Sequence, residues 1–561
     1  MFNNSESPVV GNEEKVVLGE YLFDCLKKEG ITEIFGVPGD YNFSLLDHLE
    51  NYEGINFVNG RNELNSGYAA DGYARVKGIA ALITTFGVGE LSACNAIAGS
   101  NSEHVPVIHI VGAPPSMDQQ EHKLMHHTLM DGNFDTFRKV YEPITAYSVK
   151  ITLENAMQEI PTAIHLAKEK KKPVYLVIAD DLVTKPVVMR QPMLPKSTMT
   201  NPKTLQAALA HAKQLLESSE QSVLLVDVKM MRFHLQQDAL ALAEAMNLPV
   251  ASMMFGKGGF DESHPNFIGM YAGQFGSDTV RSMIESAQSV ITIGLVWADT
   301  NTAKFSAMLD PLKMIDIQPE KVKIGHAEYP NVLAQDMIKG LKSMGYKQKE
   351  PIPTFPYPYV EEKQNPEALL SAKSYYPRIQ QMLKVNDIVI GETGSFFYGL
   401  SQVRLPRGVT YITQGGWQSI GYATPSTFGA SIAAPDRRVL LFTGDGSIQL
   451  TAQEISSMLT NGCKPIIFVL NNGGYTIEKY LNVKTKNQLY NQVPNWEYTK
   501  LPEAFGERAF TAVVKTNKEL DDAIKQAEAE SSNKLCMIEM LITNPLDAPE
   551  YMVKMREYLE R

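Results

Sequence analysis

The segment 439–472, VLLFTGDGSIQLTAQEISSMLTNGCKPIIFVLNN, constrains the fold of this chain more than any other part of the sequence. An apolar run at 439–443 is followed by Asp445 and a helical stretch, and a second apolar run at 465–470 ends in Asn471 and Asn472. Short apolar runs that alternate with helices are typical of parallel sheets. The segment therefore predicts a strand–helix–strand unit with Asp445 and Asn472 at the carboxyl ends of two strands.

These two side chains indicate a metal site. Parallel α/β sheets bind their ligands outside the carboxyl ends of the strands. Gly444 and Gly446 allow an anionic group to approach the backbone closely. A carboxylate and an amide oxygen, completed by water and phosphate oxygens, suit an octahedral Mg²⁺ ion held on a diphosphate. We therefore predict a magnesium and diphosphate site at Asp445 and Asn472.

Length and composition exclude several classes of protein. A chain of 561 residues is too long for one core, so several domains are expected. The net charge of −11 argues against a nucleic-acid partner, which would require a basic face. No apolar run is long enough to span a membrane. The chain has 4 scattered cysteines without a CxxC pair and begins with a polar, acidic segment unlike a signal or transit peptide, so we expect a cytoplasmic protein whose cysteines form neither disulfides nor zinc sites.

The order of apolar runs and amphipathic helices divides the chain into three blocks. We expect α/β domains with doubly wound parallel sheets at 13–185, 203–345 and 367–545, and a C-terminal helix at 546–561. The proline-rich stretches at 185–202 and 347–366 interrupt the periodicity and are predicted to be linkers.

The first block contains a second group of candidate residues. Asp40 follows Pro-Gly, Glu63 lies on a predicted helix, and His126 and His127 are adjacent. Taken singly, each has a simple structural explanation: a turn or helix cap, a solvated helix face, and a surface or core pair. Their significance depends on the combination.

Several motifs together resemble one family along nearly the whole chain. They are FGVPGDYNFSLLD, NELNSGYAADGYAR, TTFGVGELSA, HHTLMDGNF, GDGS, NNGGYTIEK and YNQVPNWEYTKLPEAFG. The chain resembles the thiamine-diphosphate-dependent 2-oxo acid decarboxylases, which include pyruvate, indolepyruvate and branched-chain 2-oxo acid decarboxylases. The His-His pair and the glutamate of GYTIEK separate this group from relatives such as acetolactate synthase. The resemblance also implies the three-domain fold of thiamine diphosphate enzymes, with an N-terminal pyrimidine-binding domain and a C-terminal diphosphate-binding domain.

The resemblance implies roles for the candidate residues. Glu63 matches the glutamate that contacts the cofactor's pyrimidine ring and promotes removal of the C2 proton. Proton transfer around the substrate is implied for Asp40, His126, His127 and Glu478. The implied metal ligands are the side chains of Asp445 and Asn472 and the carbonyl of Gly474.

Other residues match cofactor and substrate contacts of the family. Ile420 matches the large aliphatic residue that holds the cofactor in its bent shape. The remaining implied cofactor contacts are Thr393, Ser395, Gln418, Gly444, Gly446, Ser447, Tyr475 and Ile477. Thr300, Phe397 and Ile477 fall at positions that line the substrate pocket.

The implied reaction is non-oxidative decarboxylation of a 2-oxo acid, with thiamine diphosphate and Mg²⁺ as cofactors. Pyruvate, giving acetaldehyde and CO₂, is the expected substrate. Because Thr300 is smaller than the aromatic residue of several pyruvate enzymes, longer aliphatic, branched or aromatic 2-oxo acids remain an alternative. The resemblance also implies an active site shared by two chains, hence a homodimer at minimum and a homotetramer as the expected assembly.

Three residues depart from the family pattern. Gly473 stands where an acidic or amide residue is common, and Gln418 replaces a common glycine. Arg61 replaces a small residue near Glu63, and we expect it to face solvent. We expect metal binding to persist, because the backbone ligand at Gly474 is retained.

Three other functions are alternatives to decarboxylation. A carboligase of the acetolactate synthase type shares the cofactor motif but does not require His-His or Glu478. A dinucleotide- or nucleotide-binding protein is disfavoured because neither GxGxxG after a strand nor GxxxxGK[ST] is present. A non-catalytic homologue would be expected to lack Glu63 or Glu478, and both are present.

Overall fold

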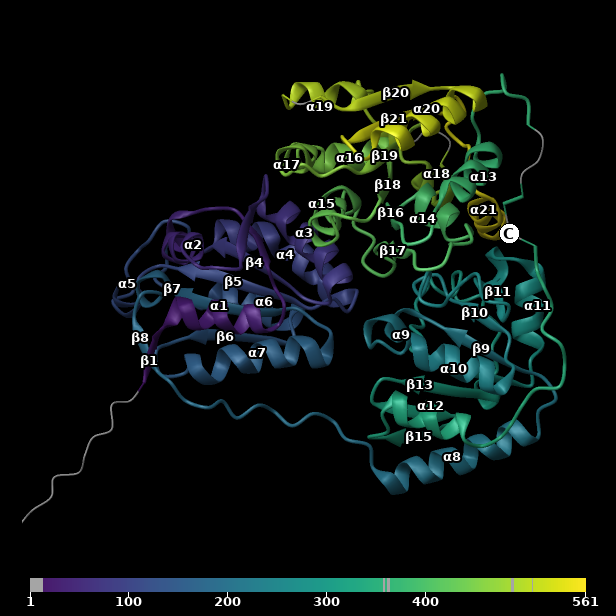
Figure 1. Ribbon diagram of the computed structural model, residues 1–561, viewed down its shortest axis with the longest axis horizontal. Coiled ribbons are helices and arrows are strands. Elements are labelled where there is room, and N and C mark those ends of the chain that lie inside the picture. Colours follow the sequence, from purple (N-terminus) through teal and green to yellow (C-terminus); the bar gives the residue numbers. More distant parts are fainter. Residues whose placement is uncertain (1–13, 357–358, 361–363, 486–488, 507) are drawn as a thin grey trace, which may run out of the picture. The chain divides into compact units, whose positions relative to one another are not determined.

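The computed structural model describes residues 14–356, 359–360, 364–485, 489–506 and 508–561 (Figure 1). The N-terminal segment, on which the expectation about targeting sequences depends, lies outside these residues. The chain folds into two compact units, one of residues up to 70, 79–101 and 106–196, the other of 71–78, 102–105 and 197–561. No helix within the described ranges is long and apolar enough to cross a lipid bilayer.

The first unit is built on a six-stranded parallel sheet with the order β3-β2-β4-β5-β7-β6. Its strands are β2 (Glu33–Gly36), β3 (Asn56–Asn59), β4 (Ala80–Thr85), β5 (Val107–Ala113), β6 (Tyr147–Ile151) and β7 (Val174–Ala179). A separate antiparallel pair joins β1 (Lys15–Val17) to β8 (Pro186–Val188). The strand at β8 lies in a stretch predicted to be a linker.

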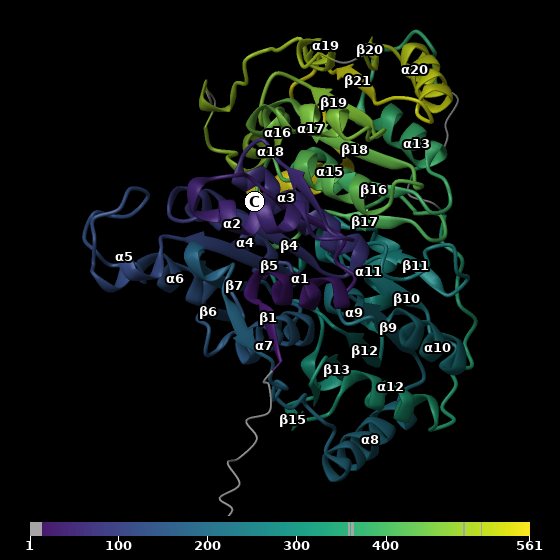
Figure 2. The ribbon, with the colours of Figure 1, turned by 60° about the vertical axis from the view of Figure 1, so that its left-hand side comes forward.

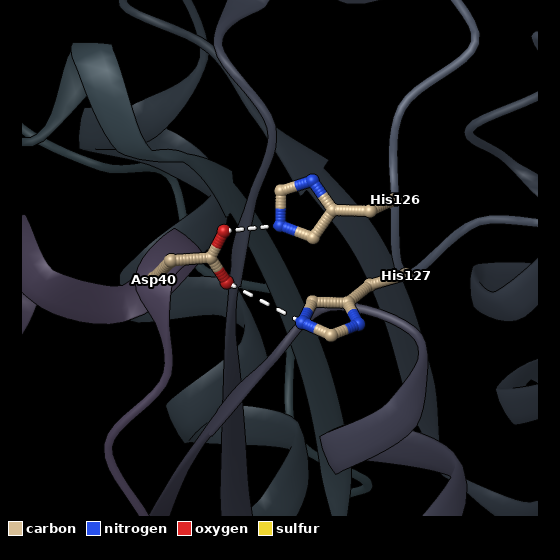
Figure 3. Close-up of side chains that lie close together, drawn as sticks. All are labelled: Asp40, His126 and His127. Atoms are coloured by element: carbon tan, nitrogen blue, oxygen red, sulfur yellow. Dashed lines mark hydrogen bonds and ion pairs between the residues drawn. The ribbon is translucent and has the colours of Figure 1, made fainter.

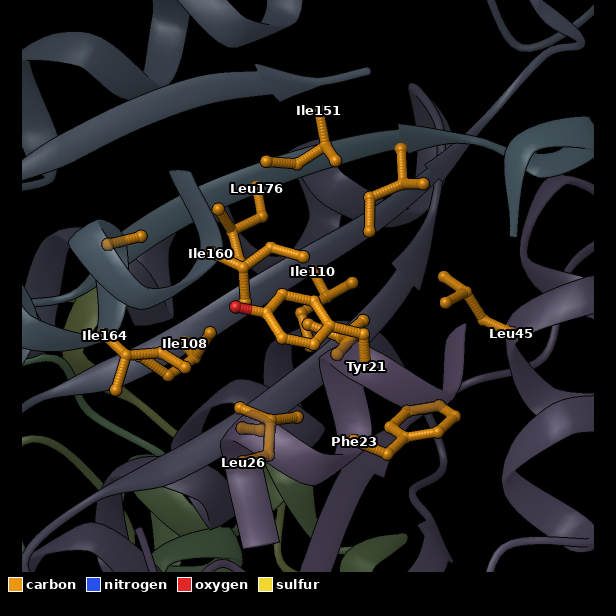
Figure 4. Packing of buried hydrophobic residues seen from close by; sticks show 14 of the residues in the cluster. Tyr21, Phe23, Leu26, Leu45, Ile108, Ile110, Ile151, Ile160, Ile164 and Leu176 are labelled. Carbon is orange, nitrogen blue, oxygen red and sulfur yellow. The ribbon is translucent and has the colours of Figure 1, made fainter. Parts of the chain in front are cut away.

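Helices cover both faces of this sheet, as its apolar strands require. On one face, α1 (Leu18–Lys28), α2 (Phe43–Glu50) and α7 (Ala156–Lys170) pack on a single apolar cluster that includes Ile83 of β4 (Figure 4). Leu82 points the opposite way because successive strand residues alternate between faces. It lies beside Gly67 of α3 (Glu63–Lys77), which packs directly on Ala96 of α4 (Val88–Ser102).

The second unit contains two sheets, and the first of them is only partly parallel. Its order is β11-β10-β9-β12-β13-β14-β15, with β9 (Ser222–Val226), β10 (Val250–Ser252), β11 (Phe267–Met270), β12 (Ser289–Ile293) and β13 (Met314–Gln318) parallel. Strands β14 (Lys321–Ile324) and β15 (Ala327–Pro330) are antiparallel, which corrects the expectation of a fully parallel sheet. Only Pro319 and Glu320 join β13 to β14, too few residues for a crossover, so the chain turns back as a hairpin.

The second sheet of this unit is parallel throughout, in the order β17-β16-β18-β19-β21-β20 (Figure 2). Its strands are β16 (Ile388–Gly391), β17 (Thr410–Ile412), β18 (Val439–Gly444), β19 (Ile466–Asn471), β20 (Phe510–Val514) and β21 (Cys536–Leu541). Since β18 and β19 are neighbours, the residues that follow them emerge at the same edge of the sheet. The strand–helix–strand unit predicted from the sequence is therefore confirmed.

Further helices complete the two units. The first unit adds α5 (Ser116–Gln120) and α6 (Thr136–Tyr141). The domain around β9 carries α8 (Pro202–Glu217), α9 (Val228–Arg232), α10 (Gln236–Met246), α11 (Asp278–Ser286) and α12 (Ala334–Lys342). The domain around β18 carries α13 (Ala372–Met382), α14 (Ser395–Leu400), α15 (Ala423–Ala433), α16 (Asp445–Thr451), α17 (Glu454–Thr460), α18 (Thr476–Leu481), α19 (Leu501–Ala504), α20 (Asn517–Glu530) and the C-terminal α21 (Glu550–Glu560).

Candidate active site

Asp445 is held at the end of β18 by the backbone that follows β19. Its Oδ2 accepts hydrogen bonds from the backbone N–H groups of Asn472 at 3.2 Å, Gly473 at 2.7 Å and Gly474 at 3.2 Å. Its Oδ1 accepts one from the N–H of Gly446 at 2.8 Å. Burial raises the pKa of Asp445, and these four donors act in the opposite direction because they favour the carboxylate. The carboxylate is thus oriented before any ligand arrives.

The side-chain oxygen of Asn472 is the second predicted ligand group. Its Nδ2 donates to Thr476 Oγ1 at 2.8 Å, which orients the amide and leaves Oδ1 on the other side. Oδ1 is buried and has no hydrogen-bond partner among the described residues. A buried acceptor without a partner is costly, and a bound cation would satisfy it. The donor set of Asp445, Asn472 and the backbone at Gly474 therefore fits Mg²⁺.

Strand alternation explains why Asn472, rather than Asn471, is available to a metal. Asn471 ends β19, and its Nδ2 donates to Glu539 at 2.7 Å and to Asn495 at 2.9 Å. The amide of Asn471 is consequently committed to structural contacts. Adjacent residues of an extended chain point in opposite directions, so Asn472 is directed away from those partners.

Different local constraints act at the glycine positions of this segment. A Cβ at Gly446 would lie 2.4 Å from the ring of Tyr475, so no side chain fits there. A Cβ at Gly444 would meet no protein atom within 4 Å. Gly473 has φ +72°, a left-handed conformation that glycine adopts at low cost. The departure from the family pattern at Gly473 therefore matches the local backbone, and its N–H still reaches Asp445.

A cavity of about 440 Å³ opens beside Asp445 and brings together most of the predicted cofactor residues of this unit. The predicted residues on its wall are Thr393, Ser395, Gln418, Ile420, Gly444, Asp445, Gly446, Ser447, Asn472, Gly474, Tyr475, Ile477 and Glu478. These come from the turns after β16, β18 and β19 and from the segment before α15. Glu478 lies on α18 and is exposed, so an acid lies in the same wall as the predicted metal ligands.

Two predicted pocket residues are outside this wall. Phe397 is 1% exposed and packs in an aromatic cluster with Tyr398, Phe275 and Tyr551 of α21. Thr300 lies behind Gln418, whose Nε2 approaches its Oγ1 at 3.3 Å. Neither Thr300 nor Phe397 is among the described residues that line the cavity.

Gln418 occupies a glycine-like conformation. Its φ is +54°, which accounts for the glycine common at this position in the family. The side chain turns back on its own loop, where Nε2 donates to the carbonyl of Gly415 at 2.9 Å. The backbone at Gln418 is therefore placed by the loop, and the longer side chain is accommodated beside Thr300.

Glu392 is a cavity residue that was not predicted from the sequence. It is 1% exposed, and its two oxygens accept from the backbone N–H groups of Thr393 at 3.0 Å and Ala423 at 3.2 Å. Burial raises the pKa of Glu392 to about 8. The carboxyl joins the turn that carries Thr393 to the start of α15, which follows Ile420. Glu392 directly follows the apolar run that forms β16, and an acid at the end of such a run was the available signal.

The first unit brings Asp40, His126 and His127 together (Figure 3). Nε2 of His126 lies 2.5 Å from Asp40 Oδ2, and Nε2 of His127 lies 3.6 Å from Asp40 Oδ1. The hydroxyl of Tyr41 is 3.1 Å from Nδ1 of His126, and the two rings stack at 4.9 Å. Tyr41 is therefore a supporting residue that the sequence analysis did not identify.

The loop after β4 supports His127. His127 has φ +60°, and its carbonyl oxygen lies where a Cβ of Gly87 would be, so Gly87 makes this close approach possible. Glu90 accepts a hydrogen bond from the N–H of Gly87 at 2.7 Å and one from the hydroxyl of Tyr175 at 2.5 Å. Burial raises the pKa of Glu90 to about 7. Glu90 thus fixes the loop on which His127 rests.

Glu63 begins α3 and is half-buried. Its Oε1 would lie 3.2 Å from a Cβ placed on Gly89, so the first turn of α4, which follows that loop, borders the glutamate. Arg61 is exposed, as expected from the sequence. Glu63 and the Asp40–His126–His127 cluster belong to one unit, and the cavity at Asp445 belongs to the other.

Comparisons with known proteins identify the family of the chain and the extent of its domains. Sequence models of the thiamine pyrophosphate enzymes match the chain in three parts: the N-terminal TPP binding domain at 16–134, the central domain at 209–340 and the C-terminal TPP binding domain at 392–540. Thiamine pyrophosphate is thiamine diphosphate under another name. The three matched segments fall within the three predicted domains.

Similar curated proteins cover almost the full length. The chain is 38% identical over 542 residues to an alpha-keto-acid decarboxylase of Mycobacterium leprae, covering 96% of this chain and 94% of that protein. It is 38% identical over 548 residues to a pyruvate decarboxylase of Aspergillus fumigatus, covering 95% of each. With matches of this extent in all three domains, the chain belongs to the family of thiamine-diphosphate-dependent 2-oxo acid decarboxylases.

Proposed function

We propose that this protein decarboxylates pyruvate to acetaldehyde and CO₂ with thiamine diphosphate and Mg²⁺. The observation that carries the proposal is the unpaired Oδ1 of Asn472 beside Asp445, in a cavity whose wall also contains Glu478. The first two groups suit a cation on a diphosphate, and the third suits proton transfer to a substrate. The names of the Mycobacterium leprae and Aspergillus fumigatus proteins support the same class of reaction.

The cofactor would be held by the residues of this cavity. Asp445, Asn472 and the backbone at Gly474 would ligate Mg²⁺, and Ile420 would support the cofactor's bent shape. Bound thiamine diphosphate supplies the electron sink that a 2-oxo acid lacks when it loses CO₂. Glu392 keeps the turns around Thr393 and Ala423 at a fixed separation, so this pocket is shaped before the cofactor enters.

The protein's own groups handle the protons. Glu63 would share a proton with the pyrimidine ring, for which its half-buried position on α3 is suitable. The imidazole Nε2 of His126 and the carboxylate of Asp40 can hold and pass one proton across their 2.5 Å contact. His127 and Glu478 would orient the substrate carboxylate and assist release of the aldehyde.

We propose a homodimer as the minimum assembly and a homotetramer as the working form. In this proposal, Asp40, Glu63, His126 and His127 of one chain face the Asp445 cavity of its partner. The loop that carries the histidines and the preceding helix α5 support this, because they expose large apolar side chains, as expected of a surface that a partner covers. These are Met117, Leu124, Leu129 and Met130. Sedimentation velocity would test the assembly, and a monomer with full activity would contradict it.

The preferred substrate is the least constrained part of the proposal. Thr300 contacts Gln418 and Phe397 contacts Tyr398, and both of these neighbours line the cavity, so Thr300 and Phe397 can influence pocket width through them. One methylene group changes discrimination in an apolar pocket by about 1–3 kcal/mol. We therefore expect pyruvate to be accepted together with longer aliphatic 2-oxo acids.

Steady-state kinetics with pyruvate, 2-oxobutanoate, 2-oxoisovalerate and phenylpyruvate, with added thiamine diphosphate and Mg²⁺, test the substrate range. Aldehyde formation from pyruvate is the expected result. A branched or aromatic substrate that is strongly preferred would favour the alternative reading, and a preference for pyruvate above about a thousandfold would exclude a broad range.

Two further measurements separate decarboxylation from carboligation and from a non-catalytic role. Product analysis with a second 2-oxo acid present should give aldehyde, whereas an acetohydroxy acid as the main product would indicate a carboligase. The variant Glu63→Gln should lose nearly all turnover while it still binds Mg²⁺ and cofactor. Unchanged turnover in Glu63→Gln would contradict the assigned role.

A further inference from the structure

The cluster of Asp40, His126 and His127 has the composition of a transition-metal site. One carboxylate oxygen and one imidazole nitrogen from each histidine all lie within 4.8 Å of one another. Two imidazoles and a carboxylate are a common ligand set for Zn²⁺, which takes water in its remaining position. Ligand atoms of a tetrahedral zinc site are about 3.3 Å apart, given metal–ligand distances near 2.0–2.1 Å. We propose that this cluster binds Zn²⁺ and that the bound ion inhibits the enzyme.

The side chains are arranged for such a site before any metal is bound. Tyr41 contacts Nδ1 of His126 at 3.1 Å, which directs Nε2 toward Asp40. With a metal on Nε2, Nδ1–H would donate to the Tyr41 oxygen. The hydroxyl of Tyr41 would in turn donate to the carbonyl of His126, which lies 3.3 Å away. An outer hydrogen bond of this kind fixes the tautomer and orientation of a ligating histidine.

The ligand positions differ only moderately from those of a zinc site. His126 and Asp40 need to separate, since their ligand atoms are 2.5 Å apart, and His127 needs to move slightly toward Asp40 from 3.6 Å. The side chains of His126 and Asp40 are 57% and 38% exposed, so these movements and the entry of an ion are sterically open within this unit.

The two cation sites of the chain would select different metals. Asp445 and Asn472 offer oxygen ligands, which Mg²⁺ prefers, whereas the cluster at Asp40 offers two imidazole nitrogens, which favour Zn²⁺. Inhibition is expected because zinc on Nε2 of His126 and His127 would occupy the atoms that handle protons. This inhibitory consequence rests on the proposed function, whereas metal binding itself does not.

Metal binding is tested first on the protein without thiamine diphosphate, with Mg²⁺ present in excess. Titration with Co²⁺, followed by its visible absorption, and with Zn²⁺, followed by calorimetry, should each show one tight site. The variants His126→Gln and His127→Gln should weaken binding at least about tenfold, and so should Tyr41→Phe, which keeps all three ligands but removes the outer hydrogen bond.

His122→Gln is the matched control. His122 lies on the same loop, but its Nδ1 is hydrogen-bonded to the carbonyl of Gly132 at 2.9 Å, and it is not part of the cluster. This variant should bind Co²⁺ as the wild type does. Absence of the absorption band, or equal affinity in the wild type, His126→Gln and His127→Gln, would overturn the metal site.

Inhibition is tested on the holoenzyme with saturating thiamine diphosphate. Zn²⁺ should abolish turnover, and a chelator with strong preference for Zn²⁺ over Mg²⁺ should restore it. Relief of inhibition by a tenfold rise in Mg²⁺ would show that zinc acts at Asp445 instead and would overturn the proposal. Binding without any loss of turnover would overturn the inhibitory role. An enzyme inactive even without zinc would instead contradict the proposed function and leave the binding result intact.

Discussion

The carboxylate of Asp445 accepts a 2.7 Å hydrogen bond from the backbone N–H of Gly473, although 28 positions separate the two residues. This contact exists because β18 and β19 are neighbours in a parallel sheet and release their chain ends at one edge. It holds the turn after β19 against the start of α16, and thereby places the oxygen of Asn472 beside the same cavity.

Asn472→Ala is expected to weaken Mg²⁺-dependent binding of thiamine diphosphate by at least about tenfold, since changes even in the surroundings of a metal ligand typically cost that much. The fold should persist, because Oδ1 of Asn472 has no protein partner among the described residues and only the Nδ2 contact to Thr476 is lost. Quenching of intrinsic fluorescence on cofactor titration measures the affinity. Asn461→Ala, which removes an amide bonded only locally to Ser457, should leave it unchanged.

Glu392→Gln is expected to cost about 1–3 kcal/mol of unfolding free energy, because a glutamine must direct its NH₂ group at one of two backbone N–H donors. Glu90→Gln is the matched substitution and should cost less. There the partner of one oxygen is the hydroxyl of Tyr175, which can rotate and accept a hydrogen bond instead. Urea denaturation of both variants measures the difference, and equal losses would contradict this account of Glu392.

The pH dependence of stability should also change in Glu392→Gln. The pKa of Glu392 is raised from 4.5 to about 8 in the folded state, so folding takes up a proton between these values. The stability that this group contributes is fully present below pH 4.5 and is lost as pH rises to about 8. The glutamine variant lacks this component, so its unfolding free energy should fall less than that of the wild type over this range. Parallel curves for the two proteins would argue against the raised pKa.

Gly446→Ala is expected to destabilise the protein by about 1–3 kcal/mol, because overpacking forces neighbouring side chains from their positions. Its Cβ would lie 2.4 Å from the Tyr475 ring, and that ring lines the cavity, so cofactor affinity should fall as well. Gly444→Ala has no protein atom within 4 Å of the new methyl group, and its stability should stay within about 0.5 kcal/mol of the wild type. Urea denaturation and cofactor titration of both variants measure these effects. Equal stability and cofactor affinity in Gly446→Ala and Gly444→Ala would show that the Tyr475 ring does not exclude a side chain at Gly446.

Tyr551→Ala is expected to lower the free energy of unfolding by about 3–5 kcal/mol, the usual range for removing a large buried ring. Tyr551 of α21 stacks on Tyr398 at 4.8 Å, and Tyr398 lines the cavity beside Asp445, so turnover should fall together with stability. Tyr551→Phe keeps the stacked ring and should retain both properties. A fully active Tyr551→Ala enzyme would show that α21 does not support the cavity.

Much of the C-terminal domain could be predicted from its sequence because the relevant signals are local. The apolar runs that became β16, β18 and β19 are short, continuous and followed by glycine or polar residues, as buried parallel strands are. The hairpin of β14 and β15 was not predicted, since Lys321–Ile324 alternates charged and apolar residues and resembles no buried strand. Its position at the sheet edge explains that pattern, which becomes clear only when the strand order is known.

The sequence by itself determined which chemical groups this protein has and which family it belongs to. Motif spacing predicted Asp445 and Asn472 as metal ligands, because residues at the ends of strands carry local signals, and the resemblance to the family implied roles for Glu63 and the histidine pair. Only the tertiary structure decided which atoms are available. In the structure, the amide of Asn471 is hydrogen-bonded to Glu539, whereas Oδ1 of Asn472 has no partner among the described residues. Tyr41 contacts His126, and Glu392 is buried between two turns. These outcomes depend on packing between segments distant in the chain, which local sequence patterns do not encode.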